Sequence, residues 1–304
     1  MSATPIDLSR LASPDIIETI DFETLFATLK AKFIALVPAE EQVEIAETLK
    51  LESEPIVRLL QLLAYREMTL RQRVNDAARR IMLAYAIDSD LDHLAALVGI
   101  KRQTITPADP EKGTQALMEG NADLRTRIQL APQSFSVAGP EGAYISRARN
   151  AHAHVLDATA ISPAPCEVLV TILSRLGDGA AEPSLIDAVV AALSAADVRP
   201  LTDQVTVKSA EIIKYSVRAT LTFFSGPDRA VALAEANKAM KRYTEQMHRL
   251  GMEVTLDGIY AAARAPGVQK VVLEGPLQGI QASKTQAPYC TGIELIDGGV
   301  YSHE

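Results

Sequence analysis

His152 and His154 are the residues of this sequence that come nearest to a metal site. They stand two positions apart at the expected start of a strand, where such side chains share one face. Two imidazoles can begin a metal site, but zinc takes three or four protein ligands, and no third or fourth ligand is apparent nearby in the sequence. We therefore interpret both as ordinary strand-start histidines and expect no metal.

Other groups with possible chemistry are isolated. Asp90, Asp92 and His93 gather at the expected start of a helix, where acids usually cap free backbone N–H groups. The glycines of residues 176–180 follow an expected strand as a plain turn, not a phosphate loop. The sequence lacks the glycine-rich nucleotide motifs, the HExxH and CxxC metal motifs and the GxSxG nucleophile motif. We expect no catalytic residue and no cofactor.

The composition narrows the classes of partner. The formal net charge is −8, and phosphate binding needs a basic face, so we expect no nucleic acid. Aromatic residues make up 5% of the chain and Trp is absent, which argues against a carbohydrate platform. Cys166 and Cys290 match no metal spacing and are expected to be free thiols. The first residues carry no secretion signal and no apolar run is long enough to span a bilayer, so we expect cytoplasmic synthesis and no membrane partner.

The stretch from residue 51 to 100 is the main element that would position functional residues in this chain. From Pro55 to Tyr85 it predicts one continuous helix, about 46 Å long at a rise of ~1.5 Å per residue. A heptad seam runs along it in alternating steps of four and three. The seam consists of Ile56, Leu60, Leu63, Glu67, Leu70, Val74, Ala77 and Ile81. It predicts either a core helix of its own domain or a surface for helices of other chains.

Charged residues lie in and around this seam. Glu67 is its one charged member, and a register-setting interface residue is favoured over a general acid, since no substrate pocket is implied. We expect Arg71, four residues on, or an arginine of another chain to pair with it. Arginines flank the seam, and they form either a solvated face or bidentate pairs with carboxylates of a partner, which the acidic stretch 40–54 could supply within or between copies of the chain. They are Arg58, Arg66, Arg71, Arg73, Arg79 and Arg80, of which Arg66, Arg71 and Arg73 are our candidates for polar interface contacts.

The rest of the chain predicts an α+β protein. Hydrophobic periodicity is helical up to residue 100 and becomes alternating from about residue 155, with helices between the strands. Two strings starting at Tyr144 and Tyr260 align without gaps as helix, turn and strand, which suggests two related modules as the alternative to coincidence. The predicted organisation is an N-terminal arm with short helices (1–50), a long helix with a short one (51–104), a linker with a helix (105–134), and two α/β modules with antiparallel or mixed sheets (135–200 and 201–304).

Several strings occur in a specific order. They are LESEP at 51–55, AYRE at 64–67, RQRVNDAAR at 71–79, SVAG at 136–139, GAY at 142–144, DVRPLTDQVTV at 197–207, HRLG at 248–251, IYAA at 259–262 and TQA at 285–287. Together they closely resemble the baseplate assembly protein J family of contractile-tailed phages and phage-derived R-type bacteriocins. The resemblance extends over nearly the whole chain, from about residue 6 to 297.

This resemblance implies a structural role. Members are baseplate wedge proteins, in which two copies join one tail protein I type partner through a three-stranded helical bundle. Wedges close a ring around the hub and spike, a lysozyme-fold wedge protein links them to the sheath, and the ring opens when the sheath contracts. The chain would then lie in the baseplate of a virion or bacteriocin particle assembled in the bacterial host cytoplasm. The alternative is a tail adaptor that binds a host receptor or glycan.

Overall fold

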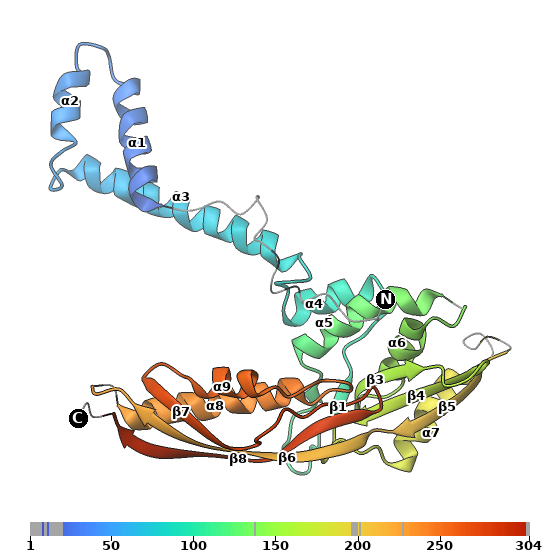
Figure 1. Cartoon of the computed structure of the whole chain (residues 1–304). Coiled ribbons are helices and arrows are strands. Elements are labelled where there is room, and N and C mark those ends of the chain that lie inside the picture. Colours follow the sequence, from blue (N-terminus) through green and yellow to red (C-terminus); the bar gives the residue numbers. More distant parts are fainter. Residues whose placement is uncertain are drawn as a thin grey trace. The chain divides into compact units, whose positions relative to one another are not determined.

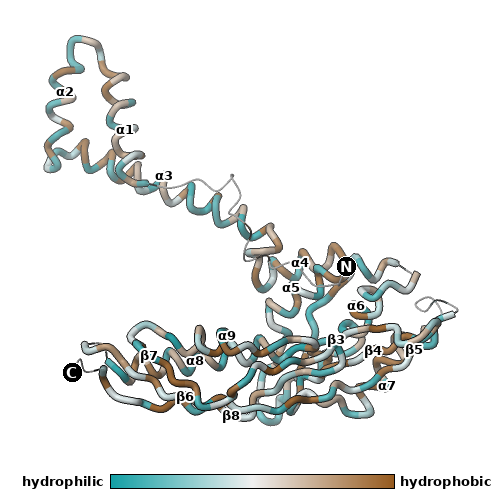
Figure 2. Tube along the Cα trace, in the orientation of Figure 1, coloured by the Kyte–Doolittle hydropathy of each residue, from teal (hydrophilic) through white to brown (hydrophobic). Residues whose placement is uncertain are grey.

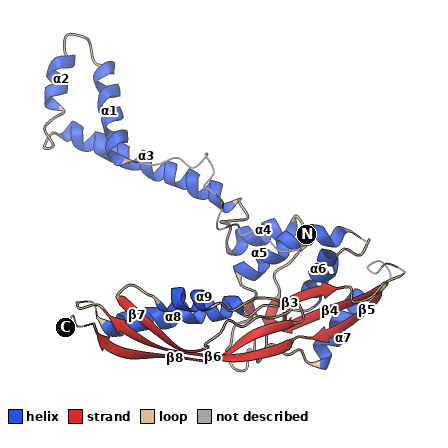
Figure 3. Ribbon diagram, in the orientation of Figure 1, coloured by secondary structure: helices blue, strands red, loops and turns tan. Residues whose placement is uncertain are grey.

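The computed structural model describes residues 21–136, 138–195, 202–226 and 228–301, together with Leu8, Leu11 and Pro200. The chain divides into two compact units, one of residues 6–97 and one that joins residues 98–304 with residues 1–5. Most of the expected N-terminal arm lies outside the described residues. In Figure 3 the first unit contains helices, whereas the strands belong to the second.

Helices α1 to α4 make up the described part of the first unit (Figure 1). Asp21 caps the first of them by accepting a hydrogen bond from the backbone N–H of Thr24 at 3.0 Å. Pro55 stands in the first turn of the third, where its missing N–H costs nothing. The helices are α1 (Phe22–Leu36), α2 (Gln42–Thr48), α3 (Pro55–Arg80) and α4 (Asp88–Ala96).

The long helix α3 is shorter than the sequence predicts, because it ends at Arg80 and not at Tyr85. After Arg80 the backbone makes tight turns, with the N–H of Met82 donating to Arg79 O and that of Tyr85 to Met82 O. These turns bring Ala86 to a fully buried position before α4 begins. The helix therefore ends at these turns, which begin at the exposed Ile81 and lead to the buried Ala86.

The core of the helical unit lies against the N-terminal half of α3. Leu49, Val57 and Leu60 are buried there, and they pack against partly buried aromatic and aliphatic side chains of α1 and α2. This apolar contact holds the three helices together, since isolated helices of this length are marginal in water.

The segment expected to be a linker forms a small hairpin at the start of the second unit. Strands β1 (Thr104–Thr106) and β2 (Leu117–Met118) pair antiparallel, and a bridge joins Asp109 to Thr114. Pro107, Pro110 and Gly113 lie between these short strands, and Gly120 follows the second strand. Helix α5 (Asn121–Leu130) and a 3-10 helix (Ala131–Phe135) follow.

Two three-stranded sheets with the same pairing pattern form the rest of the second unit. In each, the central strand pairs antiparallel with one neighbour and parallel with the other, in the orders β3-β4-β5 and β7-β6-β8. The fold is therefore α+β, as predicted. The first module comprises α6 (Glu141–Ala151), β3 (Val155–Ile161), β4 (Glu167–Ser174), α7 (Pro183–Leu193) and β5 (Gln204–Ser209). The second comprises β6 (Glu211–Phe223), α8 (Arg229–Met247), α9 (Leu256–Ala263), β7 (Val268–Gly275) and β8 (Gln286–Val300).

The two modules differ in the order of their halves along the chain. A helix followed by the antiparallel edge strand comes first in one module, as α6–β3, and second in the other, as α9–β7. A central strand followed by a helix comes second in the first module, as β4–α7, and first in the other, as β6–α8. Both edge-strand halves contain the aligned strings that start at Tyr144 and Tyr260.

The sheets are covered by helices on the faces that carry alternating apolar side chains. Ala158, Val170 and Ile172 face α6 and α7 in the first module, whereas Val217, Leu221 and Phe223 face α8 and α9 in the second. A further buried cluster joins the modules through Leu156, Leu173, Ala210, Leu250 and Ala287. The apolar interior of the second unit thus consists of a cluster in each module and a further cluster between the modules.

Only Ala210 separates β5 from β6, and it keeps the backbone hydrogen-bonded across the junction. Its N–H donates to Ile172 O of the first sheet at 2.9 Å, while the next N–H, of Glu211, donates to Thr285 O at 3.0 Å. The chain therefore passes from one sheet directly into the other.

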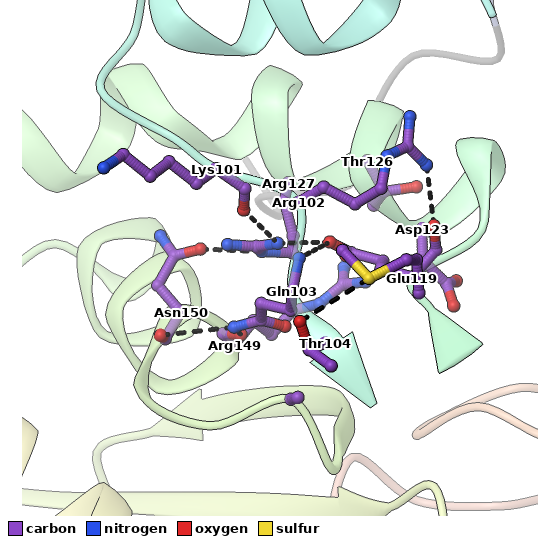
Figure 4. Close-up of polar contacts among 12 residues, drawn as sticks. Lys101, Arg102, Gln103, Thr104, Glu119, Asp123, Thr126, Arg127, Arg149 and Asn150 are labelled. Atoms are coloured by element: carbon purple, nitrogen blue, oxygen red, sulfur yellow. Dashed lines mark hydrogen bonds and ion pairs between the residues drawn. The ribbon is translucent and has the colours of Figure 1, made fainter. Parts of the chain in front are cut away.

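A buried polar cluster ties the first segments of the second unit to α6 (Figure 4). Glu119 is 2% exposed and forms an ion pair with Arg127, which is 6% exposed. Arg127 also donates through Nε to Asn150 Oδ1 at 2.8 Å, and the amide of Gln103 donates to the carbonyl oxygen of Arg149. Burial lowers the pKa of the Arg127 guanidinium, and the Glu119 carboxylate opposes that shift. The sequence patterns do not predict this cluster.

We predict that a fragment of residues 98–304 melts cooperatively and at a higher temperature than one of residues 135–304. The shorter fragment loses the buried Leu124 and Ile128 of α5 together with the polar cluster. It also loses the hydrogen bond between His154 Nε2 and Ile105 O. Calorimetry on both fragments and the full chain measures this, and equal melting temperatures would show that residues 98–134 are dispensable.

We predict that Glu119→Leu costs about 3–5 kcal/mol in the free energy of unfolding, because it leaves the buried Arg127 guanidinium unpaired. The double variant Glu119→Leu with Arg127→Leu should recover most of that loss, since neither charge then remains. Glu235→Leu, which removes one partner of an exposed ion pair with Lys238, is the control and should cost less than about 1 kcal/mol. Urea unfolding of the full chain measures all three, and a single variant as mild as the control contradicts the prediction.

Candidate partner-binding surface on helix α3

The structure divides the predicted seam of α3 into a covered and an uncovered part. Ile56 and Leu60 pack into the core with α1 and α2. Beyond them, Leu63 is 44%, Leu70 51% and Val74 62% exposed. Ala77 is exposed as well, and Ile81, just past the helix end, is 73% exposed. In the single chain, the C-terminal half of the seam is therefore open to solvent.

A second stripe of side chains on α3 is buried within the first unit of the chain itself. It consists of Val57, Leu60, Ala64, Asn75 and Ala78, all buried. Small and apolar residues thus lie on two adjacent sides of the helix, and in Figure 2 hydrophobic and hydrophilic positions alternate along it. The predicted seam does not distinguish the two sides. It also omits Leu59 and Leu62, which are exposed and widen the open side.

Glu67 lies in the middle of the seam and pairs with Arg71, as predicted. Arg71 donates to Glu67 Oε1 through Nη2 at 2.7 Å and through Nε at 3.1 Å. Both side chains are about two-fifths exposed, so the pair is half-solvated in the single chain. The carboxylate is satisfied along its own helix before any other chain approaches.

The remaining arginines of α3 differ in their surroundings. Arg66 and Arg73 are exposed, and no ion pair is recorded for either within the part of the chain that the structure describes. Arg80 is exposed and approaches Asp90 with its Nε at 3.9 Å from Oδ2. Exposed pairs at such a distance contribute little to stability.

His152 and His154 lie together but carry their own backbone partners. Their ring centroids are 4.9 Å apart, His152 Nδ1 accepts from the backbone N–H of His154, and His154 Nε2 lies 3.0 Å from Ile105 O. They line an open pocket of about 440 Å³ with Asp178 and Glu182. Asp178 is held by Lys214 at 2.8 Å, which lowers the pKa of that carboxyl. Among the described residues, no group of three or more His, Cys, Asp or Glu side chains is placed to hold a metal ion.

The other isolated candidates are local structure. Residues 176–180 form the expected turn, with the N–H of Ser174 donating to Gly179 O. The expectation that Asp90 and its neighbours cap α4 is wrong, because Ile87 occupies the N-cap position and Asp88 and Asp90 lie within the first turn. Acidic side chains at that position still stabilise the helix through its dipole.

Cys166 and Cys290 are free thiols. In the described ranges, no helix is both long and apolar enough to cross a membrane.

Comparison with known proteins agrees with the ordered strings of the sequence. The family model of the Baseplate J-like N-terminal domain matches residues 52–109, which include α3, and that of the Baseplate J-like central domain matches residues 136–209. Baseplate protein J of Escherichia phage P2 is 45% identical over 296 residues, covering 97% of this chain and 98% of that protein.

A solved structure of the anti-feeding prophage (AFP) baseplate, determined by cryo-EM and 6-fold symmetrised, is a remote neighbour. It is 18% identical, covers 48% of this chain and 36% of the other, and has a TM-score of 0.37. A likeness of that degree carries no argument. The 45% identity to the phage P2 protein extends along nearly the full length of both chains. It shows that this chain belongs to the Baseplate J-like family of baseplate proteins.

Proposed function

We propose that this chain is a structural wedge component in the baseplate of a contractile injection system, a phage tail or an R-type bacteriocin. Its helix α3 packs in a helical bundle with a second copy of the chain and a partner of the tail protein I type. The observation that carries this proposal is the open half of the seam, where Leu63, Leu70, Val74 and Ile81 lie exposed at heptad spacing.

The size of the exposed seam supports a stable contact. Full burial of an exposed large aliphatic side chain contributes roughly 1.5–3 kcal/mol, and these four are only about half exposed, so together they contribute on the order of 3–7 kcal/mol before the cost of association. An uncovered apolar surface that continues along one helix is typical of a protein-interaction site.

The α/β modules have a second role in this proposal. With their neighbours in the ring they close the baseplate around the hub and spike, and a lysozyme-fold wedge protein links the wedge to the sheath. Opening of that ring accompanies sheath contraction. Strands β3, β5, β7 and β8 are sheet edges, and such edges pair readily with other chains. The particle is assembled in the bacterial host cytoplasm.

The proposed role is not enzymatic. His152 and His154, the nearest approach to a metal site, use ring nitrogens on backbone groups, and Glu67 is paired with Arg71. No specific observation in the described residues favours the receptor-binding or glycan-binding alternative.

We predict that the backbone amides of residues 63–80 exchange faster in the free chain than those of residues 56–62, and become strongly protected in the wedge complex. Val74→Glu should prevent complex formation, because it places a charge in the apolar seam. Leu36→Glu is the matched control, since Leu36 is equally apolar, 84% exposed and on α1. Hydrogen exchange by mass spectrometry and co-purification measure both effects. Equal protection of residues 63–80 in both states would sink the proposal.

We further predict that Glu67→Leu leaves the chain folded but allows oligomers of wrong stoichiometry. The lost pair with Arg71 is half-solvated and worth roughly 0.5 kcal/mol, whereas a polar residue inside a seam fixes register and partner choice. Gln72→Leu adds the same side chain on another side of α3 and serves as the control. Native mass spectrometry of complexes coexpressed with the wedge partners gives the stoichiometry. Unchanged stoichiometry and yield in the Glu67 variant would show that Glu67 does not specify the bundle.

A further inference from the structure

Arginines repeat along one edge of the open seam. With Leu60, Glu67, Val74 and Ile81 at position a of the heptad and Leu63, Leu70 and Ala77 at position d, the neighbouring g positions are Leu59, Arg66, Arg73 and Arg80. Residues at g lie beside the seam and face the flank of the helix that packs on it. The C-terminal part of α3 therefore presents a row of guanidinium groups, spaced by one heptad, to an incoming helix.

This arginine edge, defined as Arg66, Arg73 and Arg80, is exposed and largely uncompensated. All three residues are exposed. In the described part of the chain no ion pair is recorded for Arg66 or Arg73, and the contact of Arg80 with Asp90 spans 3.9 Å. By contrast, Arg71, on the other edge of the seam, already holds Glu67. The positive charge at g is thus available to a partner.

The opposite edge of the seam differs in chemistry. The e positions are Val57, Ala64, Arg71 and Ala78, of which the three apolar residues are buried within the chain's own unit. None of the four is acidic. The two edges of α3 are therefore not complementary to each other.

A second copy of α3 cannot neutralise the arginine edge. In a parallel pair in register, each g residue faces the e residue five positions on in the other helix. Arg66 would then meet Arg71 of the second copy, and Arg73 would meet Ala78. In an antiparallel pair, g residues face g residues, so arginines would meet arginines. Like charges placed opposite one another across an interface oppose association.

We propose that the arginine edge of α3 docks a helix of a different polypeptide that carries glutamate or aspartate at heptad spacing beside its own apolar seam. Carboxylates suit this position because arginine binds them in a planar, two-bonded geometry. This inference rests on the proposed function, since it assigns the partner chemistry of the same surface. It makes the apolar seam the source of affinity and the arginine edge the selector of the partner.

The test uses the full chain and two labelled synthetic helices with the same leucine seam, one with glutamate and the other with lysine at its flanking positions. Fluorescence anisotropy gives the affinity at low and high salt. We expect the glutamate helix to bind at least about tenfold more tightly at low salt, with a smaller difference at high salt, because screening weakens exposed charge pairs. The double variant Arg66→Glu with Arg73→Glu should reverse the preference.

The matched control is Arg58→Glu with Arg79→Glu, which changes the same number of charges at f positions of the same helix, away from the seam. It should keep the preference for the glutamate helix. Equal binding of both synthetic helices to the original chain would overturn the inference while leaving the apolar docking surface, and so the proposed function, intact.

Two further outcomes assign the surface to another occupant, and each overturns the inference. If neither helix binds and the chain dimerises in a way that Val74→Glu abolishes, a second copy covers the seam. If neither helix binds and the amides of residues 63–80 are protected in the free chain, another segment of the same chain covers it, and the proposed function fails as well.

Discussion

Helix α3 is longer than the helices of its own unit that pack against it. Its 26 residues span about 39 Å, whereas the 15 residues of α1 span about 22 Å and the 7 residues of α2 about 10 Å. Helices in proteins owe most of their stability to burial of an apolar face. The mismatch therefore leaves the C-terminal half of α3 with one covered side, at Asn75 and Ala78, and one open side, with Leu70 and Val74, that needs cover from elsewhere.

The open half carries separate groups for affinity and for selection. Burial of the aliphatic seam contributes affinity for any partner helix with an apolar face. Glu67 and the arginine edge, by contrast, discriminate between partners by charge and register. Glu67 is held along its own helix by Arg71. The charged groups of an interface usually govern encounter and discrimination more than raw affinity. This separation suits a chain that has to meet more than one kind of helix in a single assembly.

Much of the fold can be read from the sequence where local signals decide it. Asp21 caps α1, Pro55 begins α3, and the alternating strings predict β3 and β4. Long-range burial decides the rest. The sequence shows the apolar repeat on α3 but not which side α1 and α2 would cover, since Val57 and Ile56 are equally apolar.

The same limit applies to the second unit and to the end of α3. No local pattern marks Glu119 as buried, because the contacts that fix its partner Arg127, to Asn150 and to the carbonyl oxygen of Lys101, come from distant parts of the chain. Likewise α3 ends at Arg80 without a glycine or proline, and the turns that follow lead to Ala86, whose burial no local pattern predicts. The ordered strings indicate the family, whereas the heptad repeat on α3 and the exposure of its side chains indicate the candidate surface.

The one-residue junction at Ala210 has a mechanical consequence. Strands β5 and β6 form one nearly unbroken ribbon, each end of which is clamped by a parallel neighbour, β4 on one side and β8 on the other. Tension along this ribbon stretches the hydrogen bonds of each parallel pair together, in shear, instead of opening them one at a time from an end. We expect such a ribbon to transmit a pulling force from one module to the other with little extension, because a single residue separates the two strands.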